Sequence, residues 1–267
     1  MGADTKALKN RIRSVDSTLH TTSAMGLVAS SKMRRSNERM AGGRQYADAF
    51  ASVVDVLTAC PECAGSPFMR KTDGKRTRLI VIAGDRGLAG GYNANIFRLV
   101  ATMQYDQIIP IGKRAVDRYK GEFHSSEKFT GAEATAMARK LCKEFVDGEY
   151  DRLGIVYTRY VSMMSQEADV KWVLPLTKPE AVESISAVFE PDEETILNAT
   201  VPDYVAGILM ACIREAFASE VTARRMAMDS AGKNARAMID DLQLQYNRAR
   251  QSAITQEITE IVAGSGS

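Results

Sequence analysis

Hydrophobic side chains recur at a helical spacing near the N-terminus of the chain. From about Asp4 to Leu57, two apolar columns run with a seven-residue period, at alternating spacings of three and four residues. The columns consist of Ile12, Leu19, Gly26, Met33, Met40, Ala47 and Val54, and of Leu8, Val15, Thr22, Ala29, Ser36, Gly43, Phe50 and Leu57. This pattern predicts one long amphipathic helix with the seam of a coiled coil.

A second helical pattern occupies the C-terminal segment, from about Tyr204 to Val262. Its apolar positions are Val205, Ile208, Leu209, Cys212, Ile213, Ala216 and Phe217, and then Ala231, Ala235, Met238, Leu242, Tyr246, Ala249 and Ala253. All seven prolines fall between Pro61 and Pro202. Because proline costs about 3 kcal/mol inside a helix, the proline-free ends are the parts that can form long helices. We therefore expect one antiparallel helical pair; several shorter helices in a bundle are the alternative.

The middle of the chain alternates between strand-like and helix-like patterns. Strands are predicted at 77–83, 107–111, 153–157 and 170–174, and helices at 94–103 and 132–146. This alternation is typical of an α/β domain with a mostly parallel sheet. We thus expect three parts: an N-terminal coiled-coil helix (1–60), an α/β domain (75–190) and a C-terminal coiled-coil helix (203–263).

Two short motifs carry candidate chemistry. The segment from Gly84 to Asn93, GDRGLAGGYN, follows the first strand, where a glycine loop can hold a phosphate on its backbone N–H groups. Its glycine spacing matches neither common nucleotide-binding fingerprint, so a tight turn with close packing is the favoured interpretation. Cys60 and Cys63 form a C-x-x-C motif without a second pair at metal-site spacing, which favours two free thiols near a helix end.

Charge and composition narrow the function classes. Lysine and arginine number 35 against 33 acidic residues, which excludes a strongly basic nucleic-acid coat. Over residues 1–44, however, basic residues outnumber acidic ones nine to three, so this helix presents a solvated face or contacts an acidic partner. No aromatic residue precedes Tyr46, which argues against base stacking and hence nucleic acid. No apolar run approaches the roughly 20 residues of a membrane span, so we expect membrane association only through partners.

Several segments together resemble the gamma subunit of F-type ATP synthase. The most specific match is the C-terminal stretch from Leu242 to Val262, LQLQYNRARQSAITQEITEIV. The glycine loop resembles the central glycine motif of that family, with Ala89 where cysteine is common. Further matches are Arg11–Val15, Ala24–Arg35 and the region from Ser219 to Asp229. The expected fold is therefore α/β: a long antiparallel coiled coil of the terminal helices with an inserted Rossmann-like α/β domain.

The resemblance implies a non-catalytic rotor shaft within a proton-translocating enzyme complex. Its terminal helices turn inside a ring of alpha and beta subunits, and its α/β domain meets the epsilon subunit and the membrane ring of c subunits. Rotation then changes the nucleotide affinities of the beta sites. The implied location is the cytoplasmic side of the bacterial inner membrane, as a peripheral protein.

The same resemblance implies which residues contact partners, and it implies no catalytic, cofactor-binding or metal-binding residue. The positions that match ring-facing ones are Met25, Arg224, Arg250, Gln251, Thr255, Glu257, Ile258, Ile261 and Val262. Ser23 and Gly26 depart from the family pattern, in which lysine and a larger polar residue are usual. A coiled-coil scaffold with an α/β domain is the alternative function, and a nucleotide-using enzyme is disfavoured by the glycine spacing.

Overall fold

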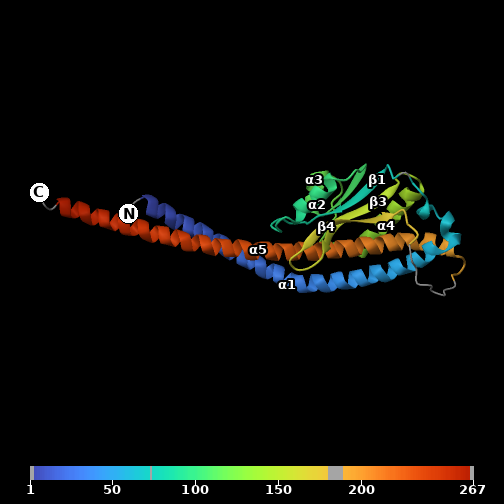
Figure 1. The fold of residues 1–267 in the computed structure, drawn as a ribbon, viewed down its shortest axis with the longest axis horizontal. Coiled ribbons are helices and arrows are strands. Elements are labelled where there is room, and N and C mark those ends of the chain that lie inside the picture. The colour runs from blue at the N-terminus through green and yellow to red at the C-terminus, as the bar shows by residue number, and fades with distance from the viewer. Residues whose placement is uncertain (1–2, 73, 180–188, 265–267) are drawn as a thin grey trace. The chain divides into compact units, whose positions relative to one another are not determined.

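A computed structural model describes residues 3–72, 74–179 and 189–264. The chain divides into two compact units, one formed by residues 1–30 and 224–267 and the other by residues 31–223. Two long helices, α1 (Ala3–Ala59) and α5 (Glu193–Gly264), contribute residues to both units. The two proline-free ends of the chain are therefore helical, as the apolar columns predict (Figure 1).

Helix α5 begins earlier than the apolar pattern predicts, at Glu193 rather than near Tyr204. It runs through Pro202, although proline removes one backbone hydrogen bond and is disfavoured inside a helix. Leu197, Val201 and Val205 are fully buried around this position, and their packing outweighs the lost bond. One 18-residue window of α5 is apolar enough by composition to cross a bilayer, but half of that window is buried inside the fold. The core position of this part of α5 accounts for that composition.

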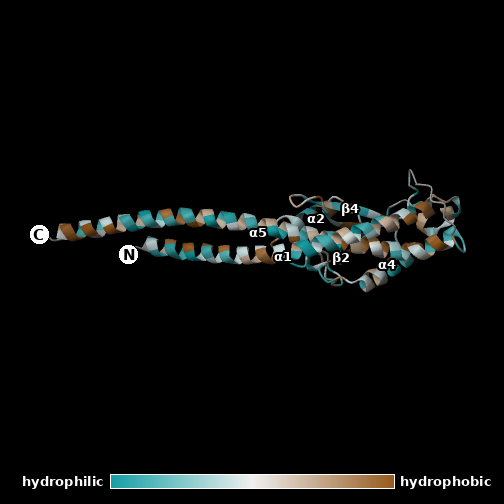
Figure 2. Cartoon of the chain, turned by 90° about the horizontal axis from the view of Figure 1, so that it is seen from below, coloured by the Kyte–Doolittle hydropathy of each residue, from teal (hydrophilic) through white to brown (hydrophobic). Residues whose placement is uncertain are grey.

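The first unit is an antiparallel pair of helical segments. In Figures 1 and 2 the N-terminal end of α1 lies along the C-terminal end of α5, and α5 extends beyond the start of α1. The most deeply buried positions of the seam are Thr5, Thr22 and Ala29 on α1, and Met228, Ala235 and Leu242 on α5. Leu8, Ile12, Val15 and Leu19 are half-buried between them. This part of the predicted coiled-coil seam is confirmed.

One predicted seam position is wrong. Met238 is 45% exposed, whereas its neighbour Ile239 is half-buried and occupies the seam. The spacing from Ala235 to the next inward residue is four rather than three. A helix that alternates three- and four-residue steps can take either residue, and the branched isoleucine lies on the inner side here.

The second unit contains a four-stranded sheet with the strand order β2-β1-β3-β4. The strands are β1 (Thr77–Ile82), β2 (Gln107–Ile111), β3 (Arg152–Tyr160) and β4 (Gln166–Leu174). β1 pairs in parallel with β2 and β3, and β3 pairs antiparallel with β4. All six residues of β1 are buried, as expected for a central strand covered on both faces. The prediction of a mostly parallel sheet is confirmed.

Three helices accompany the sheet: α2 (Tyr92–Ala101), α3 (Lys113–Tyr119) and α4 (Gly131–Val146). Two 3-10 turns, η1 (Pro61–Gly65) and η2 (Pro67–Met69), follow α1. α4 starts at a capping box, in which the Thr130 hydroxyl and the Glu133 carboxylate exchange bonds with each other's backbone N–H. The sequence pattern missed α3, because seven residues are too few to show a helical period.

The apolar core of this unit lies on both sides of the sheet. One cluster joins α1, α4 and α5 to the sheet through residues that include Leu57, Leu141 and Leu209. A second cluster joins α2 to the opposite face through Ile96, Val100 and their neighbours in β1. Both long helices therefore provide core residues here, so this part of the chain folds as one α/β unit rather than as a sheet attached to a separate rod.

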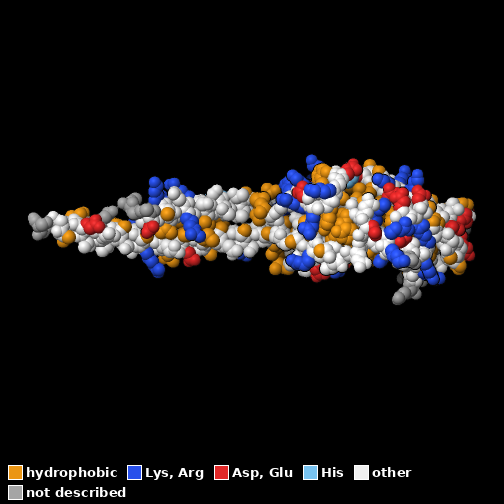
Figure 3. All heavy atoms as spheres, turned by 90° about the horizontal axis from the view of Figure 1, so that it is seen from above, with side chains coloured by type: hydrophobic (Ala, Val, Ile, Leu, Met, Phe, Trp, Pro, Cys, Tyr) orange, Lys and Arg blue, Asp and Glu red, His pale blue; other side chains and the backbone are white. Residues whose placement is uncertain are grey.

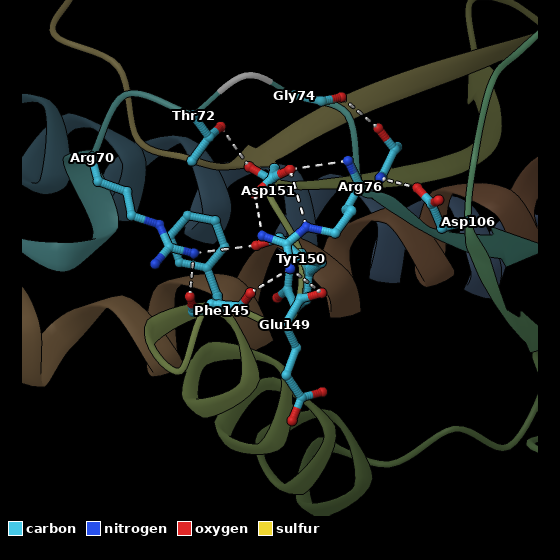
Figure 4. Close-up of polar contacts among 11 residues, drawn as sticks. Arg70, Thr72, Gly74, Arg76, Asp106, Phe145, Glu149, Tyr150 and Asp151 are labelled. Carbon is cyan, nitrogen blue, oxygen red and sulfur yellow. Dashed lines mark hydrogen bonds and ion pairs between the residues drawn. The ribbon is translucent and has the colours of Figure 1, made fainter.

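A polar network links the starts of the two central strands, β1 and β3 (Figure 4). The Asp151 carboxylate accepts hydrogen bonds from the backbone N–H of Arg76 (3.0 Å) and from its guanidinium (2.9 Å). The same guanidinium donates to the carbonyl of Gly148 at 2.7 Å. Arg70 donates to the carbonyls of Phe145 and Tyr150. These bonds tie the segment before β1 to the turn between α4 and β3.

We expect Asp151→Asn to remove a pH dependence of stability. Hydrogen bonds from Arg76 lower the pKa of Asp151. The contribution of the ionised carboxylate to the free energy of unfolding is therefore complete above the ordinary pKa near 3.8, and it is lost as the pH falls through the lowered value. At pH 7 the variant should lose about 1 kcal/mol of unfolding free energy, because Arg76 is partly exposed. Urea unfolding at several pH values between 3 and 7 should show the difference between the two proteins shrinking toward low pH. A constant difference would contradict this role.

Candidate partner-binding surfaces

The end of α5 carries apolar side chains that are largely exposed. Ile258 is 56% exposed, Ile261 70% and Val262 65%. They lie in the last turns of the helix, where α5 extends beyond the start of α1 (Figures 1 and 2). Figure 3 shows hydrophobic side chains on the surface at this end. Several exposed apolar residues close together at a helix end favour burial against another molecule.

The polar candidates Arg250, Gln251 and Thr255 are exposed on the same helix, before the apolar end. The Thr255 hydroxyl donates to the carbonyl of Gln251 at 3.0 Å, which is a local helical bond. The side chain of Glu257 lies outside the described part of the structure. The arrangement offers polar groups of both donor and acceptor type next to an apolar end.

Met25 and Arg224 are half-buried, in contrast to the candidates on the last turns of α5. Near them, a groove of about 330 Å³ lies between the two helical segments of the first unit. Gly26 faces Met228 across it, 3.6 Å from where a Cβ atom would stand. Arg225, which hydrogen-bonds to the Ser30 hydroxyl, and Lys233, which pairs with Asp229 at 2.8 Å, lie along the groove. Sequence reasoning noted the unusual Gly26 but did not predict this groove.

The glycine loop between β1 and α2 is a compact turn packed against α5. The Gly84 N–H donates to the Asn93 side chain at 2.9 Å. A Cβ atom on Gly84 would lie 2.8 Å from the Glu220 carboxyl group, so the close approach requires glycine. The Asp85 carboxylate accepts from the Ser125 hydroxyl and from the backbone N–H groups of Lys113, Ser126 and Glu127. The interpretation of this segment as a closely packed tight turn is confirmed.

The four cysteines of the described chain are free thiols. Cys60 directly follows the end of α1, and Cys63 is fully buried in the next turn. Burial raises the pKa of Cys63 to about 11 and that of Cys60 less strongly. Because the thiolate is the reactive form, both groups are poor nucleophiles at neutral pH. No group of three or more His, Cys, Asp or Glu side chains within the described ranges could hold a metal ion.

Arg44 and Glu215 join three elements of the second unit. The guanidinium of Arg44 on α1 donates to both carboxylate oxygens of Glu215 on α5, at 2.5 and 3.2 Å. It also donates to the carbonyl of Tyr160 at 2.7 Å, and the N–H of Tyr160 donates to Glu215 at 2.8 Å. We call this cluster the Arg44 clamp; it ties α1, α5 and the end of β3. Arg44 therefore serves the fold, although the basic N-terminal segment was a candidate partner surface.

Comparison with known proteins decides the family. A family model described as ATP synthase matches residues 4–267. The ATP synthase gamma chain of Ruminococcus albus is 40% identical over 282 residues, which cover 98% of each chain. The chain belongs to the ATP synthase gamma-chain family. A sodium ion specific ATP synthase gamma chain from Acetobacterium woodii is 36% identical over 99% of this chain and 98% of that relative.

Solved structures share the fold of this family member. A chain in the rotor of Euglena gracilis mitochondrial ATP synthase aligns over 95% of this chain and 100% of its own, with a TM-score of 0.67 and 16% identity. A chain in the central stalk and c-ring structure from Tetrahymena thermophila aligns over 79% of this chain, with a TM-score of 0.62 and 22% identity. The resemblance inferred from the C-terminal signature and the glycine loop is confirmed, and the chain is a subunit of an ATP synthase.

Proposed function

We propose that the chain is the central shaft of its ATP synthase and turns within a ring of alpha and beta subunits. The observation that carries this proposal is family membership over residues 4–267. The uncovered apolar end of α5 supports it, because such an end is suited to a bearing formed by other chains. The paired helical segments of the first unit support it as well, since a shaft that transmits torque must resist bending.

Met25, Arg224, Arg250, Gln251, Thr255 and Glu257 are the proposed contacts to loops of the ring. Ile258, Ile261 and Val262 are the proposed contacts to its apolar bearing. An asymmetric shaft that turns past three like sites favours a different conformation at each, and so shifts their nucleotide affinities in sequence. In this scheme the chain performs no bond-making chemistry of its own.

The proposed partners at the other end are the epsilon subunit and the c-ring, contacted through residues 31–223. The chain would then be a peripheral protein on the cytoplasmic side of a bacterial inner membrane. We propose proton flow as the driving reaction, while one relative is named sodium ion specific. Co-expression with the alpha, beta and epsilon subunits of the same source tests the scheme. ATPase activity in the co-purified complex but not in the chain alone is expected; hydrolysis by the chain alone would overturn it.

Changes near the end of α5 are expected to impair the complex more than the chain. Arg250→Ala and Gln251→Leu should each lower assembly or ATPase activity several-fold, because both side chains are exposed and make no core contact. Circular dichroism of the isolated variants should match the unaltered chain. Matched controls on the same helix are Arg248→Ala, two residues before Arg250, and Gln245→Leu, six residues before Gln251, which change the same exposed residue types. Equal effects of controls and test variants would remove the proposed roles of Arg250 and Gln251.

A further inference from the structure

A cavity of about 530 Å³ lies in the second unit, between α1, α5 and the segment that precedes α4. Its size falls within the roughly 300–1,000 Å³ that is typical of small-molecule sites. On each long helix the lining residues recur at helical spacings of three and four, so one face of each helix forms a wall. All of the lining residues lie in this unit, and the cavity is therefore part of its fold.

Part of the lining is apolar. Phe129 and Ile213 are buried, with 8% and 3% of their surfaces exposed. Met210 and Phe217 line the cavity as well and are half-buried. Side chains of this kind favour a ligand with an apolar body, aliphatic or aromatic, over a small hydrated ion.

Ser126 brings an unpaired polar group to this lining. It is 5% exposed, yet its hydroxyl has no hydrogen-bond partner among the residues that the structure describes. Its backbone N–H donates to Asp85 at 3.3 Å, which helps to fix the residue in place. Because buried hydroxyl groups are nearly always paired, this one is suited to donate to an oxygen atom of a ligand in the cavity.

Two arginines bring positive charge to the cavity from different helices. Arg39 on α1 and Arg214 on α5 are exposed, and neither forms an ion pair or a hydrogen bond within the described ranges. Arg214 lies against α1, because a Cβ atom on Gly43 would be 3.1 Å from its Cδ atom. A guanidinium presents its donors in a planar fork that matches a carboxylate. The two side chains are therefore available to an anionic ligand.

Glu127 limits the charge that the cavity can accept. It is also a lining residue, and its two carboxylate oxygens pair with Lys32 at 2.5 Å and with Arg86 at 3.6 Å. Both oxygens are thus engaged outside the pair of free arginines. Two arginines against one glutamate leave a single positive charge on the lining, which favours a monoanion over a dianion such as a phosphate monoester.

We propose that this cavity binds an amphipathic monocarboxylate. The apolar body of the ligand packs on the phenylalanine and isoleucine side chains of the lining. Its carboxylate is held by Arg39, Arg214 and the Ser126 hydroxyl. Fatty acids and aromatic acids share this chemistry, and the choice of probes distinguishes them. Because the whole site lies within residues 31–223, binding does not depend on the proposed shaft function.

Isothermal titration calorimetry of the isolated chain tests the site. Naphthoate and decanoate are the probes, and the uncharged amide of each acid is its control. At least one acid should bind saturably, with one molecule per chain and at least ten-fold more tightly than its amide, because only the acid can pair with the arginines. The acid that binds more tightly identifies the body as aromatic or aliphatic. Equal affinity of each acid and its amide, or no saturable binding of either acid, would overturn the proposal.

Variants of the lining separate a built site from general adhesion to the chain. Arg39→Ala and Arg214→Ala should each weaken binding of the acid at least five-fold, whereas Arg34→Ala, which changes an exposed arginine of α1 outside the lining, should not. Gly42→Leu should abolish binding, because Gly42 lines the cavity and a Cβ atom there meets nothing within 4 Å, so the leucine side chain can enter the space. Affinities left unchanged by all three lining variants would refute the assignment.

Ser126→Ala gives an independent readout. It should weaken binding several-fold, yet the variant should unfold at the same urea concentration as the unaltered chain or at a higher one, since alanine removes an unpaired buried hydroxyl. A lower unfolding midpoint would show that the hydroxyl has a partner within the fold, and its assignment to the ligand would then be wrong.

Discussion

Replacing Gly112 by alanine is expected to prevent stable folding of residues 31–223. Gly112 joins β2 to α3 with a φ of +91°, and a Cβ atom there would lie 1.9 Å from the carbonyl oxygen of Ala83. Ala83 directly follows β1, and its own N–H donates to the Ile111 carbonyl at 2.9 Å. The overlapping atoms therefore belong to backbone that the sheet holds in place, and neither residue can move away. We expect a loss of at least about 4 kcal/mol, from combined overlap and strain. Urea unfolding followed by circular dichroism measures it.

Gly131→Ala is the control for this prediction. Gly131 is the first residue of α4, and a Cβ atom there meets nothing within 4 Å. Alanine at this position should leave stability unchanged or raise it by up to about 1 kcal/mol. If Gly112→Ala unfolded within 1 kcal/mol of the unaltered chain, the described junction between β2 and α3 would be wrong. The junction also supports the glycine loop between β1 and α2, because Arg114 donates its N–H to the Gly84 carbonyl at 3.1 Å.

Periodicity predicted the long helices and the strands because each depends on nearby residues. Every position of the two N-terminal columns is buried or half-buried, from Leu8 to Leu57. The apolar pattern places the start of α5 too late, near Tyr204, but the segment 190–194 reads as a helix start, and α5 begins at Glu193. The helix runs through Pro202, and Leu197 and Val201 are buried around it. The error at Met238 arises because a choice between two adjacent apolar residues depends on the facing helix.

The contacts between distant residues could not be predicted from the sequence. Arg44 and Glu215 are 171 residues apart, and each looks like an ordinary surface charge in the sequence. Leu88 has a φ of +62°, in a loop whose Asp85 carboxylate accepts hydrogen bonds from residues 113 and 125–127, far away in the sequence. The proposed partner contacts on α5 rest on family resemblance. The structure adds that Ile258 is 56% and Ile261 70% exposed.

The Arg44 clamp is expected to be a sensitive polar site of the second unit. Arg44→Ala leaves the Glu215 carboxylate, whose side chain is only 8% exposed, without its cation. Breaking a buried pair costs about 3–5 kcal/mol, and the 41% exposure of the Arg44 side chain reduces the expected loss to about 2 kcal/mol. The thermal midpoint should fall by about 4–8 °C, which differential scanning calorimetry of the isolated chain measures.

A double-mutant cycle separates the pair from simple loss of packing. Glu215→Gln in the Arg44→Ala background removes the uncompensated charge, so the double variant should be more stable than Arg44→Ala alone. Arg44→Lys keeps the charge but loses the bidentate geometry, so its stability should lie between that of Arg44→Ala and that of the unaltered chain. Additive effects would show that the two side chains act independently.

Because the clamp joins both long helices to β3, a loosened clamp should also permit twisting between the helices and the sheet. Under the proposed shaft function, ion-driven ATP synthesis by the assembled complex should therefore decline more than ATP hydrolysis, since only synthesis requires torque to pass through the chain.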